Sequence, residues 1–371
     1  MKTLKKIVFW LHLVAGIFSG SIVLVMAVTG LTLAYERQIT DWADDFKISG
    51  EPTSSSLEIG ELLPSTADPA LSGILFEKDP QRPVALKYGR EKTEFYDPYT
   101  GIPLGEGNTA VRSFFHTVVG LHRWLGLEGA ARPVGKTIVG IANLIFLFLI
   151  ISGIFIWLPK KWTIKTLRSI TLWKRGLKGK ARDWRLHNVA GIWAALPLLV
   201  IVPCGTVIAF PWASDLVYKI VGETPPPHGK KKRGHGKPEG PAIEINTRSL
   251  DQALATAKAE FPEWQTIQMD IPPKKFVTVS ISDMHRGRPD KRREIRVNSK
   301  SGEIEQIEDF SSLSTGRQAR TWIRWIHTGE AGGMPGQTLA GLSAASTILL
   351  IWSGFALSWR RFRNRRRKTA Q

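Results

Sequence analysis

Four apolar stretches, each long enough to cross a lipid bilayer, constrain the fold of this 371-residue chain more than any other feature. A membrane-spanning helix needs about 20 consecutive residues that are mostly apolar. Inside a bilayer the backbone must satisfy its own hydrogen bonds, so each stretch is expected to be a helix. The stretches cover roughly residues 7–35, 137–158, 188–212 and 338–359, and polar segments separate them.

The distribution of positive charge predicts which ends of these stretches face the cytoplasm. The N-terminal lysines, the segment 159–186 and the tail from Arg360 together account for the whole net charge of +19. Short flanks rich in Lys and Arg face the cytoplasm, so both termini are expected there. Such flanks attract membrane lipid with anionic head groups. Because the charge is confined to them, no nucleic-acid partner is expected.

The sequence contains an internal repeat with a period of about 180–200 residues. Each half is expected to hold a span, a small helix-and-strand unit, and a second span. The anchors of the repeat are short apolar or glycine-containing motifs. They pair His12-x-x-Ala-Gly16 with His187-x-x-Ala-Gly191, Gly135-Lys-Thr137 with Gly336-Gln-Thr338, and Ile151-Ser-Gly153 with Trp352-Ser-Gly354.

The polar segments between the spans repeat as well. Capped helices are expected to begin at Ser56 and Ser249. Each copy then closes on a turn that needs a positive φ, supplied by Gly101 and Gly302. The expected strands between helix and turn are 73–77, 83–88 and 93–97 in the first copy, and 265–270, 276–282 and 294–298 in the second.

The fold class that follows is an α+β membrane protein with four transmembrane helices in a pseudo-twofold repeat. A Pro-, Gly- and Lys-rich segment, 225–241, is expected to be a mobile linker. The expected division is transmembrane helix 1–36, outer unit and outer helix 37–132, helix 133–158, basic cytoplasmic loop 159–186, helix 187–213, outer unit 214–333 with linker 223–242, helix 334–360 and basic tail 361–371.

Four histidines lie at or beside the ends of the spans, at matching places in the two halves. His12 and His187 fall at the cytoplasmic level, and His122 and His327 fall just outside the other two spans. Ionisable groups beside a span tend to be functional, although one such histidine can also be an interfacial residue. Paired by level, they suit two bis-histidine haems. His116, six residues before His122, is the alternative outer ligand.

Small residues follow two of these histidines on the same helix face. Gly16 and Gly20 lie four and eight residues after His12, and Gly191 lies four after His187. They would let a porphyrin lie against the helix, or they would let two helices pack closely. The single cysteine, Cys204, lies within the third span, which excludes a multi-cysteine metal site and predicts a small apolar filler.

These motifs resemble the PepSY-associated transmembrane-helix family of bacterial inner-membrane proteins, and within it the di-haem ferric-siderophore reductases of the ferrioxamine type. The resemblance covers essentially the whole chain. It implies PepSY-like periplasmic units, two b haems held by His12, His187, His122 and His327, and reduction of a ferric siderophore outside. The motifs that carry it are His12-x3-Gly16, Leu121-His122-Arg-Trp124, Ser152-Gly153 with Trp157, His187-x3-Gly191, Ile326-His327-Thr-Gly329 and the turns at Gly101 and Gly302.

On this interpretation, aromatic and basic residues near the outer haem are the candidates for holding the ferric siderophore. The same residues also suit interfacial anchoring.

No dinucleotide-binding fingerprint occurs after a strand, so the electron donor is expected to be a quinol or a cytoplasmic reductase. Two other functions stay open, an envelope sensor or protease regulator without haem, and a siderophore or haem transporter. The substrate candidates are Arg123, Trp124, Trp322, Arg324 and Trp325.

Overall fold

The chain divides into two compact units in the computed structural model. One, here called the helical unit, comprises Met1–Glu36, Ser113–Pro225 and Ala319–Gln371; the other, the sheet unit, comprises Arg37–Arg112 and Pro226–Gln318. Most of the expected linker, from residue 228 onward, lies outside the described residues. The structure describes residues 2–44, 46–49, 56–63, 70–89, 92–159, 162–227, 247–271, 276–284, 286–298 and 301–369.

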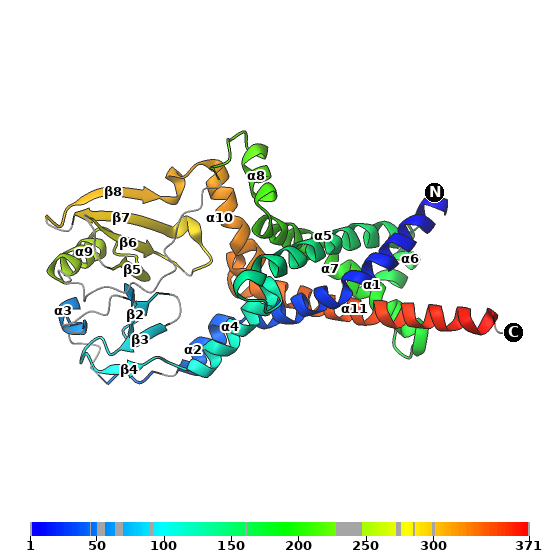
Figure 1. Ribbon diagram of the computed structural model, residues 1–371, viewed down its shortest axis with the longest axis horizontal. Coiled ribbons are helices and arrows are strands. Elements are labelled where there is room, and N and C mark those ends of the chain that lie inside the picture. Colours follow the sequence, from blue (N-terminus) through cyan, green and yellow to red (C-terminus); the bar gives the residue numbers. More distant parts are fainter. Residues whose placement is uncertain are drawn as a thin grey trace. The chain divides into compact units, whose positions relative to one another are not determined.

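Four long helices form the helical unit and confirm the α+β membrane class with four transmembrane helices. They are α1 (Lys2–Leu33), α5 (Arg132–Trp157), α7 (Gly179–Ala209) and α11 (Gly333–Thr369). Each is long and apolar enough to span a membrane. They form a ring in the order α1, α5, α7, α11, in which each helix packs against the next. The first and third spans of the chain therefore lie diagonally opposite, with both termini at one end of the bundle (Figure 1).

Proline marks the boundaries of several helices in this unit. Pro133 lies in the first turn of α5, where its missing N–H costs nothing. The third span ends at Ala209, because Pro211 begins a separate short helix, α8 (Pro211–Ile220). Another short helix, α6 (Ile164–Thr171), lies between the second and third spans and is capped by Thr163. The third span also begins at Gly179, earlier than its apolar run indicates.

Amphipathic helices precede the second and fourth spans. They are α4 (Thr109–Trp124) and α10 (Thr315–Thr328), and the helical unit includes them from Ser113 and from Ala319 onward. The chain turns shortly after the end of each helix, at Gly126 and at Gly329, and both glycines have a positive φ. The two helices thus occupy equivalent places in the two halves.

The glycines that follow His12 and His187 lie against side chains of neighbouring helices. A Cβ on Gly20 would lie 2.6 Å from the ring of Phe355 on α11, so only glycine admits that ring. A Cβ on Gly191 would lie 3.4 Å from Leu350, and one on Gly16 would lie 3.9 Å from Leu149. The contact at Gly20 fits close packing of two helices, whereas a Cβ on Gly16 or Gly191 would make only ordinary contact.

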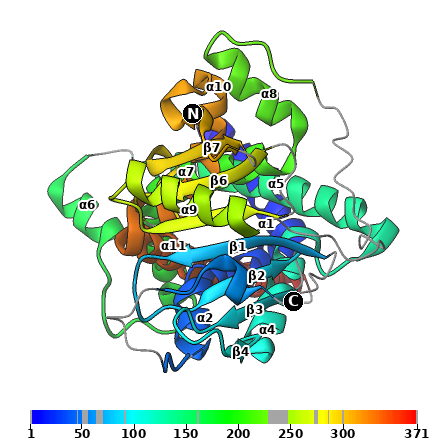
Figure 2. The same cartoon turned by 90° about the vertical axis from the view of Figure 1, so that its left-hand side faces the viewer.

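Among the described residues of the sheet unit, all strands belong to one eight-stranded antiparallel sheet. The two halves contribute four neighbouring strands each, and β1 pairs with β5 at the centre (Figure 2). The sequence predicts two small outer units, and the structure corrects this, because backbone pairing merges them into one. In sheet order the strands are β4 (Pro103–Gly105), β3 (Lys92–Tyr96), β2 (Val84–Tyr88), β1 (Leu71–Glu77), β5 (Thr266–Asp270), β6 (Phe276–Ser282), β7 (Arg292–Asn298) and β8 (Ile304–Asp309).

Every expected strand is confirmed to within two residues, and both expected helices are present, although neither is capped by the expected serine. The first helix, α3 (Ile59–Leu62), has one turn and uses Glu58 as its N-cap in place of Ser56. The second, α9 (Thr247–Glu260), begins before Ser249. Gly101 and Gly302 have φ of 69° and 75°, as the two turns require.

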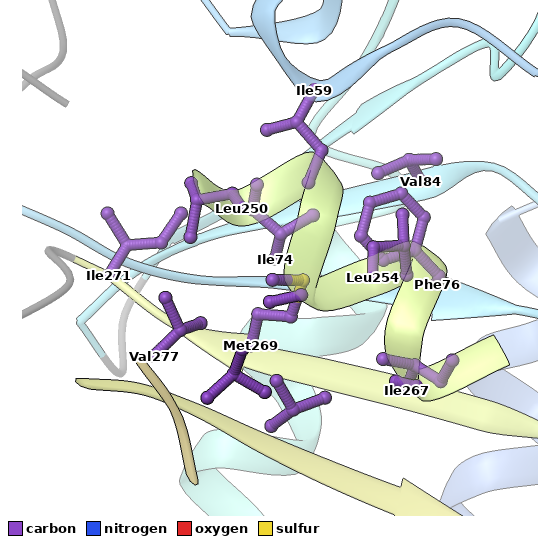
Figure 3. Close-up of a cluster of buried hydrophobic side chains, with 14 of the residues drawn as sticks. Ile59, Ile74, Phe76, Val84, Leu250, Leu254, Ile267, Met269, Ile271 and Val277 are labelled. Atoms are coloured by element: carbon purple, nitrogen blue, oxygen red, sulfur yellow. The ribbon is translucent and has the colours of Figure 1, made fainter. Parts of the chain in front are cut away.

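One hydrophobic core joins the two halves of the sheet unit. Alternate residues of the strands point to one face and pack against α3 and α9, as Figure 3 shows for Ile74, Leu250 and Met269. Burying such side chains contributes about 1.5–3 kcal/mol each. The backbone N–H of Ile59 also donates to Asp251 on α9 at 2.8 Å. The sheet unit therefore cannot form from one half of the chain.

Candidate cofactor site

The histidines of the first and third spans face each other across the bundle. His12 lies on α1 and His187 lies on α7, which are diagonal in the ring of helices. Their ring centroids are 6.4 Å apart and their planes make an angle of 83°. The structure therefore brings together the two histidines that the repeat places at one level.

The other two histidines also face each other. His122 on α4 and His327 on α10 have ring centroids 6.4 Å apart, with an angle of 51° between planes. This pair lies beside Gly30 of α1, at the opposite end of that helix from His12. With a rise of about 1.5 Å per residue, the path along α1 between the two levels is about 27 Å.

Two of the four imidazoles donate a hydrogen bond from Nδ1 to a buried hydroxyl on a neighbouring span. His12 Nδ1 lies 2.8 Å from Ser152 Oγ, and His122 Nδ1 lies 2.9 Å from Thr29 Oγ1. Each hydroxyl already donates its own hydrogen to a backbone carbonyl one turn earlier, Phe148 O and Val25 O respectively. The hydroxyl oxygens must therefore accept, which places the proton on Nδ1.

The remaining two imidazoles reach backbone carbonyls, which only accept. His187 Nδ1 lies 3.1 Å from Leu350 O and 3.0 Å from Ser353 Oγ. His327 Nδ1 lies 2.9 Å from Ile201 O. All four rings are thus held in the tautomer with a proton on Nδ1 and a lone pair on Nε2. Imidazoles that bind metals are oriented in this way by a hydrogen bond from the other ring nitrogen.

A glycine on each span lies against one of the four rings. A Cβ would lie 3.2–3.3 Å from a Cε1 atom at Gly205 and Gly30, where the ring would have to shift slightly, and 3.4–3.5 Å from one at Gly153 and Gly354, which is ordinary contact. The glycine follows a hydroxyl residue in three spans and Cys204 in the fourth. The dipeptides are Thr29-Gly30 at His122, Ser152-Gly153 at His12, Cys204-Gly205 at His327 and Ser353-Gly354 at His187.

Sequence reasoning missed the role of these dipeptides. It used Ser152-Gly153 and Ser353-Gly354 only as anchors of the repeat, and it did not use Thr29-Gly30. The available signal was a Ser, Thr or Cys followed by glycine in each span, near the level of a histidine. Cys204 occupies the place of Thr29 in the second half, and His327 bonds directly to a carbonyl of that helix.

Burial keeps the rings of the second pair neutral. Burial, followed by the charge of His327, lowers the pKa of His122 to about 4. Burial likewise lowers the pKa of His327, against the hydrogen bond to Ile201 O. At neutral pH both rings are therefore uncharged and present a lone pair.

The spacing of each pair fits two axial ligands on opposite sides of one metal ion. A metal–imidazole bond is about 2.0–2.1 Å, so two such bonds in line place the ring centroids about 6 Å apart. Within the described residues no cluster of three or more His, Cys, Asp or Glu side chains could hold a metal ion. A metal at either pair would need its other ligands from a cofactor, as the iron of a haem has.

The alternative outer histidine and the substrate candidates lie elsewhere on α4 and α10. His116 is exposed on α4, and the structure does not bring it to His327. The guanidinium of Arg123 lies 4.9 Å from the ring of Trp124, and that of Arg132 lies 3.7 Å from the same ring. Arg324 lies 5.3 Å from the ring of Trp325, while Trp322 is half-buried on the same helix.

Comparison with known proteins gives one family. The model of the family described as the PepSY-associated TM region matches residues 9–361, which is nearly the whole chain. No curated protein matches the chain. The matched region includes all four histidines and both polar segments between the spans.

Proposed function

This chain belongs to the PepSY-associated transmembrane family, and we propose that it carries electrons across a membrane on two b-type haems and reduces a ferric siderophore. Acting in this way, the protein is a haem-dependent ferric-siderophore reductase, and its product is Fe(II) for iron uptake. Each Fe(III) takes up one electron.

The observation that carries the proposal is the pair of facing imidazoles at each end of the helical unit. His12 with His187, and His122 with His327, have the same centroid separation of 6.4 Å. In each ring the Nδ1 proton is tied to another helix, which leaves Nε2 for a metal. When bound, a b-type haem supplies a reversible one-electron carrier.

The chain's own residues hold, orient and shield the cofactors. Ser152, Thr29 and Ser353 are buried, so water does not compete for their hydrogen bonds to the histidines. The adjacent glycines let the edge of each ring come close to the span. Because the two members of each pair come from different halves, neither half completes a site alone.

The direction of electron flow follows from the charge of the flanks. The basic flanks support an orientation with both termini and the His12–His187 pair at the cytoplasmic side of a bacterial inner membrane, near anionic lipid. The sheet unit is then periplasmic. A quinol or a cytoplasmic reductase supplies the electrons, and the ferric siderophore meets the His122–His327 side. Arg123, Trp124, Arg132, Arg324 and Trp325 are the groups proposed to contact it there.

The test is the haem content of the purified full-length protein. The expected result is two b-type haems per chain by pyridine haemochrome, with a reduced spectrum that a ferric siderophore reoxidises. A folded but colourless protein would overturn the proposal and favour an envelope sensor or protease regulator. Two haems without reoxidation, together with uptake of the chelate into vesicles, would favour a siderophore or haem transporter.

Thr29 and Cys204 offer a matched pair of variants for the hydrogen bonds behind the histidines. Thr29→Val removes the acceptor of His122 Nδ1, and a lost partner of this kind lowers metal affinity about 10- to 100-fold. Cys204→Val changes the equivalent place in the other half, where His327 bonds to Ile201 O instead. Haem loss to a scavenger should therefore quicken in the first variant only. Equal rates in the two variants would contradict this role for Thr29.

A further inference from the structure

Trp157, the last residue of α5, has an indole N–H that is shielded from solvent and has no hydrogen-bond partner in the described part of the chain. Indole nitrogen is a donor only, and a buried donor normally has an acceptor. Interfacial tryptophans usually keep this N–H in reach of water. The N–H of Trp157 therefore has no acceptor among the residues that the structure describes.

Trp157 lies near the level of the His12–His187 pair along helix α5. It lies one helical turn beyond Gly153, the glycine against the His12 ring, so both are on one face of α5. Long side chains in a helix lean back toward its N-terminus. The indole is therefore expected to extend back toward the turn at Gly153.

Lys5 brings a positive charge to the same place. It lies seven residues before His12 on α1, two turns away on the same face. Its ammonium donates to Leu158 O at 2.7 Å and lies 5.8 Å from the ring of Phe155. No carboxylate among the described residues is paired with it. An ammonium has three donors, so this contact leaves two for another acceptor.

We propose that Lys5 and Trp157 bind a carboxylate of the cofactor held by His12 and His187, that is, one propionate of a porphyrin. This inference rests on the proposed function and deepens it. Lys5 has no carboxylate partner among the described residues and bonds to the carbonyl of Leu158, the residue after Trp157. Together with the orphaned N–H of Trp157, this ammonium suits an anionic oxygen acceptor. The cofactor would then be fixed in one orientation, with its carboxylates toward the end of the bundle that holds the termini.

The variants that test the proposal are Lys5→Gln and Trp157→Phe, with Lys180→Gln as the matched control. Lys180 lies seven residues before His187, as Lys5 lies before His12, but its side chain is exposed. The full-length protein is reconstituted with haem or with haem dimethyl ester, whose carboxylates are blocked. Two quantities are measured, the rate of haem loss to a scavenger and the midpoint potential of each haem.

With ordinary haem, loss of one of the two haems should be about tenfold faster in Lys5→Gln and Trp157→Phe, as expected for a lost charge-assisted hydrogen bond. Lys180→Gln should behave as the parent protein does. With the dimethyl ester the differences should vanish. Retention of the other haem shows that each variant is folded, and a change in potential at one haem alone would exclude a general structural effect.

Failure of this inference is distinct from failure of the proposed function. A parent protein without haem would overturn both. Two haems in the parent, with unchanged loss in Lys5→Gln and in Trp157→Phe, would overturn the carboxylate contact alone. The same acceleration with the ester as with ordinary haem would also overturn it, because the effect would then be one of packing.

Discussion

Replacing His122 with alanine is expected to leave the purified protein with one haem per chain in place of two. His122 faces His327 at 6.4 Å between ring centroids, and a b-type haem has no covalent link to replace a missing ligand. The His12–His187 pair is built on other helices and should keep its haem. Pyridine haemochrome on protein of known concentration measures the change, and a redox titration shows which potential disappears.

His116→Ala is the control that this helix provides. His116 precedes His122 by six residues on α4 and is exposed, so its loss should leave both haems in place. If His116→Ala loses a haem and His122→Ala does not, the outer ligand is His116. His187→Ala should remove the other haem by the same reasoning. Loss of both haems from a folded single variant would show that the two sites are not independent.

The pairing of the histidines was accessible from the sequence because it depends on level and periodicity. An apolar run fixes where a helix crosses the membrane, and the repeat places His12 and His187 at equivalent depths. The strands were accessible for a similar reason. Alternation of apolar and polar residues identifies a strand with one buried face, as in β6, whose observed bounds equal the expected ones.

What the sequence could not reveal depends on contacts between distant segments. The central pairing of Leu75 with Gln268 joins two strands that have no local signal for each other. Helix starts were misjudged because Glu58, with Glu61 three residues later, makes the capping contacts in place of a serine. The hydroxyl behind His12 comes from Ser152, on another helix, and nothing near His12 in the sequence points to it.

Replacing Gly336 with alanine is expected to be among the most disruptive single changes in the helical unit. A Cβ on Gly336 would overlap the backbone oxygen of Gly329, and one on Gly329 would overlap that of Gly336. Gly329 has φ of 77° and lies two residues after His327. Since backbone atoms cannot rotate aside, α10 must move away from α11. Overpacking of this kind costs about 1–3 kcal/mol or more.

The repeat makes the prediction for Gly336 testable twice. A Cβ on Gly135 would overlap the backbone oxygen of Trp124, two residues after His122, so Gly135→Ala should act on the same pair from the other half. Both variants should lower the melting temperature and lose the haem of His122 and His327 first. Gly332→Ala is the control, because a Cβ there meets nothing within 4 Å.

If Gly336→Ala keeps both haems and melts at the same temperature as Gly332→Ala, the backbone contact does not position His327. If it does position the histidine, Gly135 and Gly336 recur in the two halves because each lets a helix end come close enough to present one ligand.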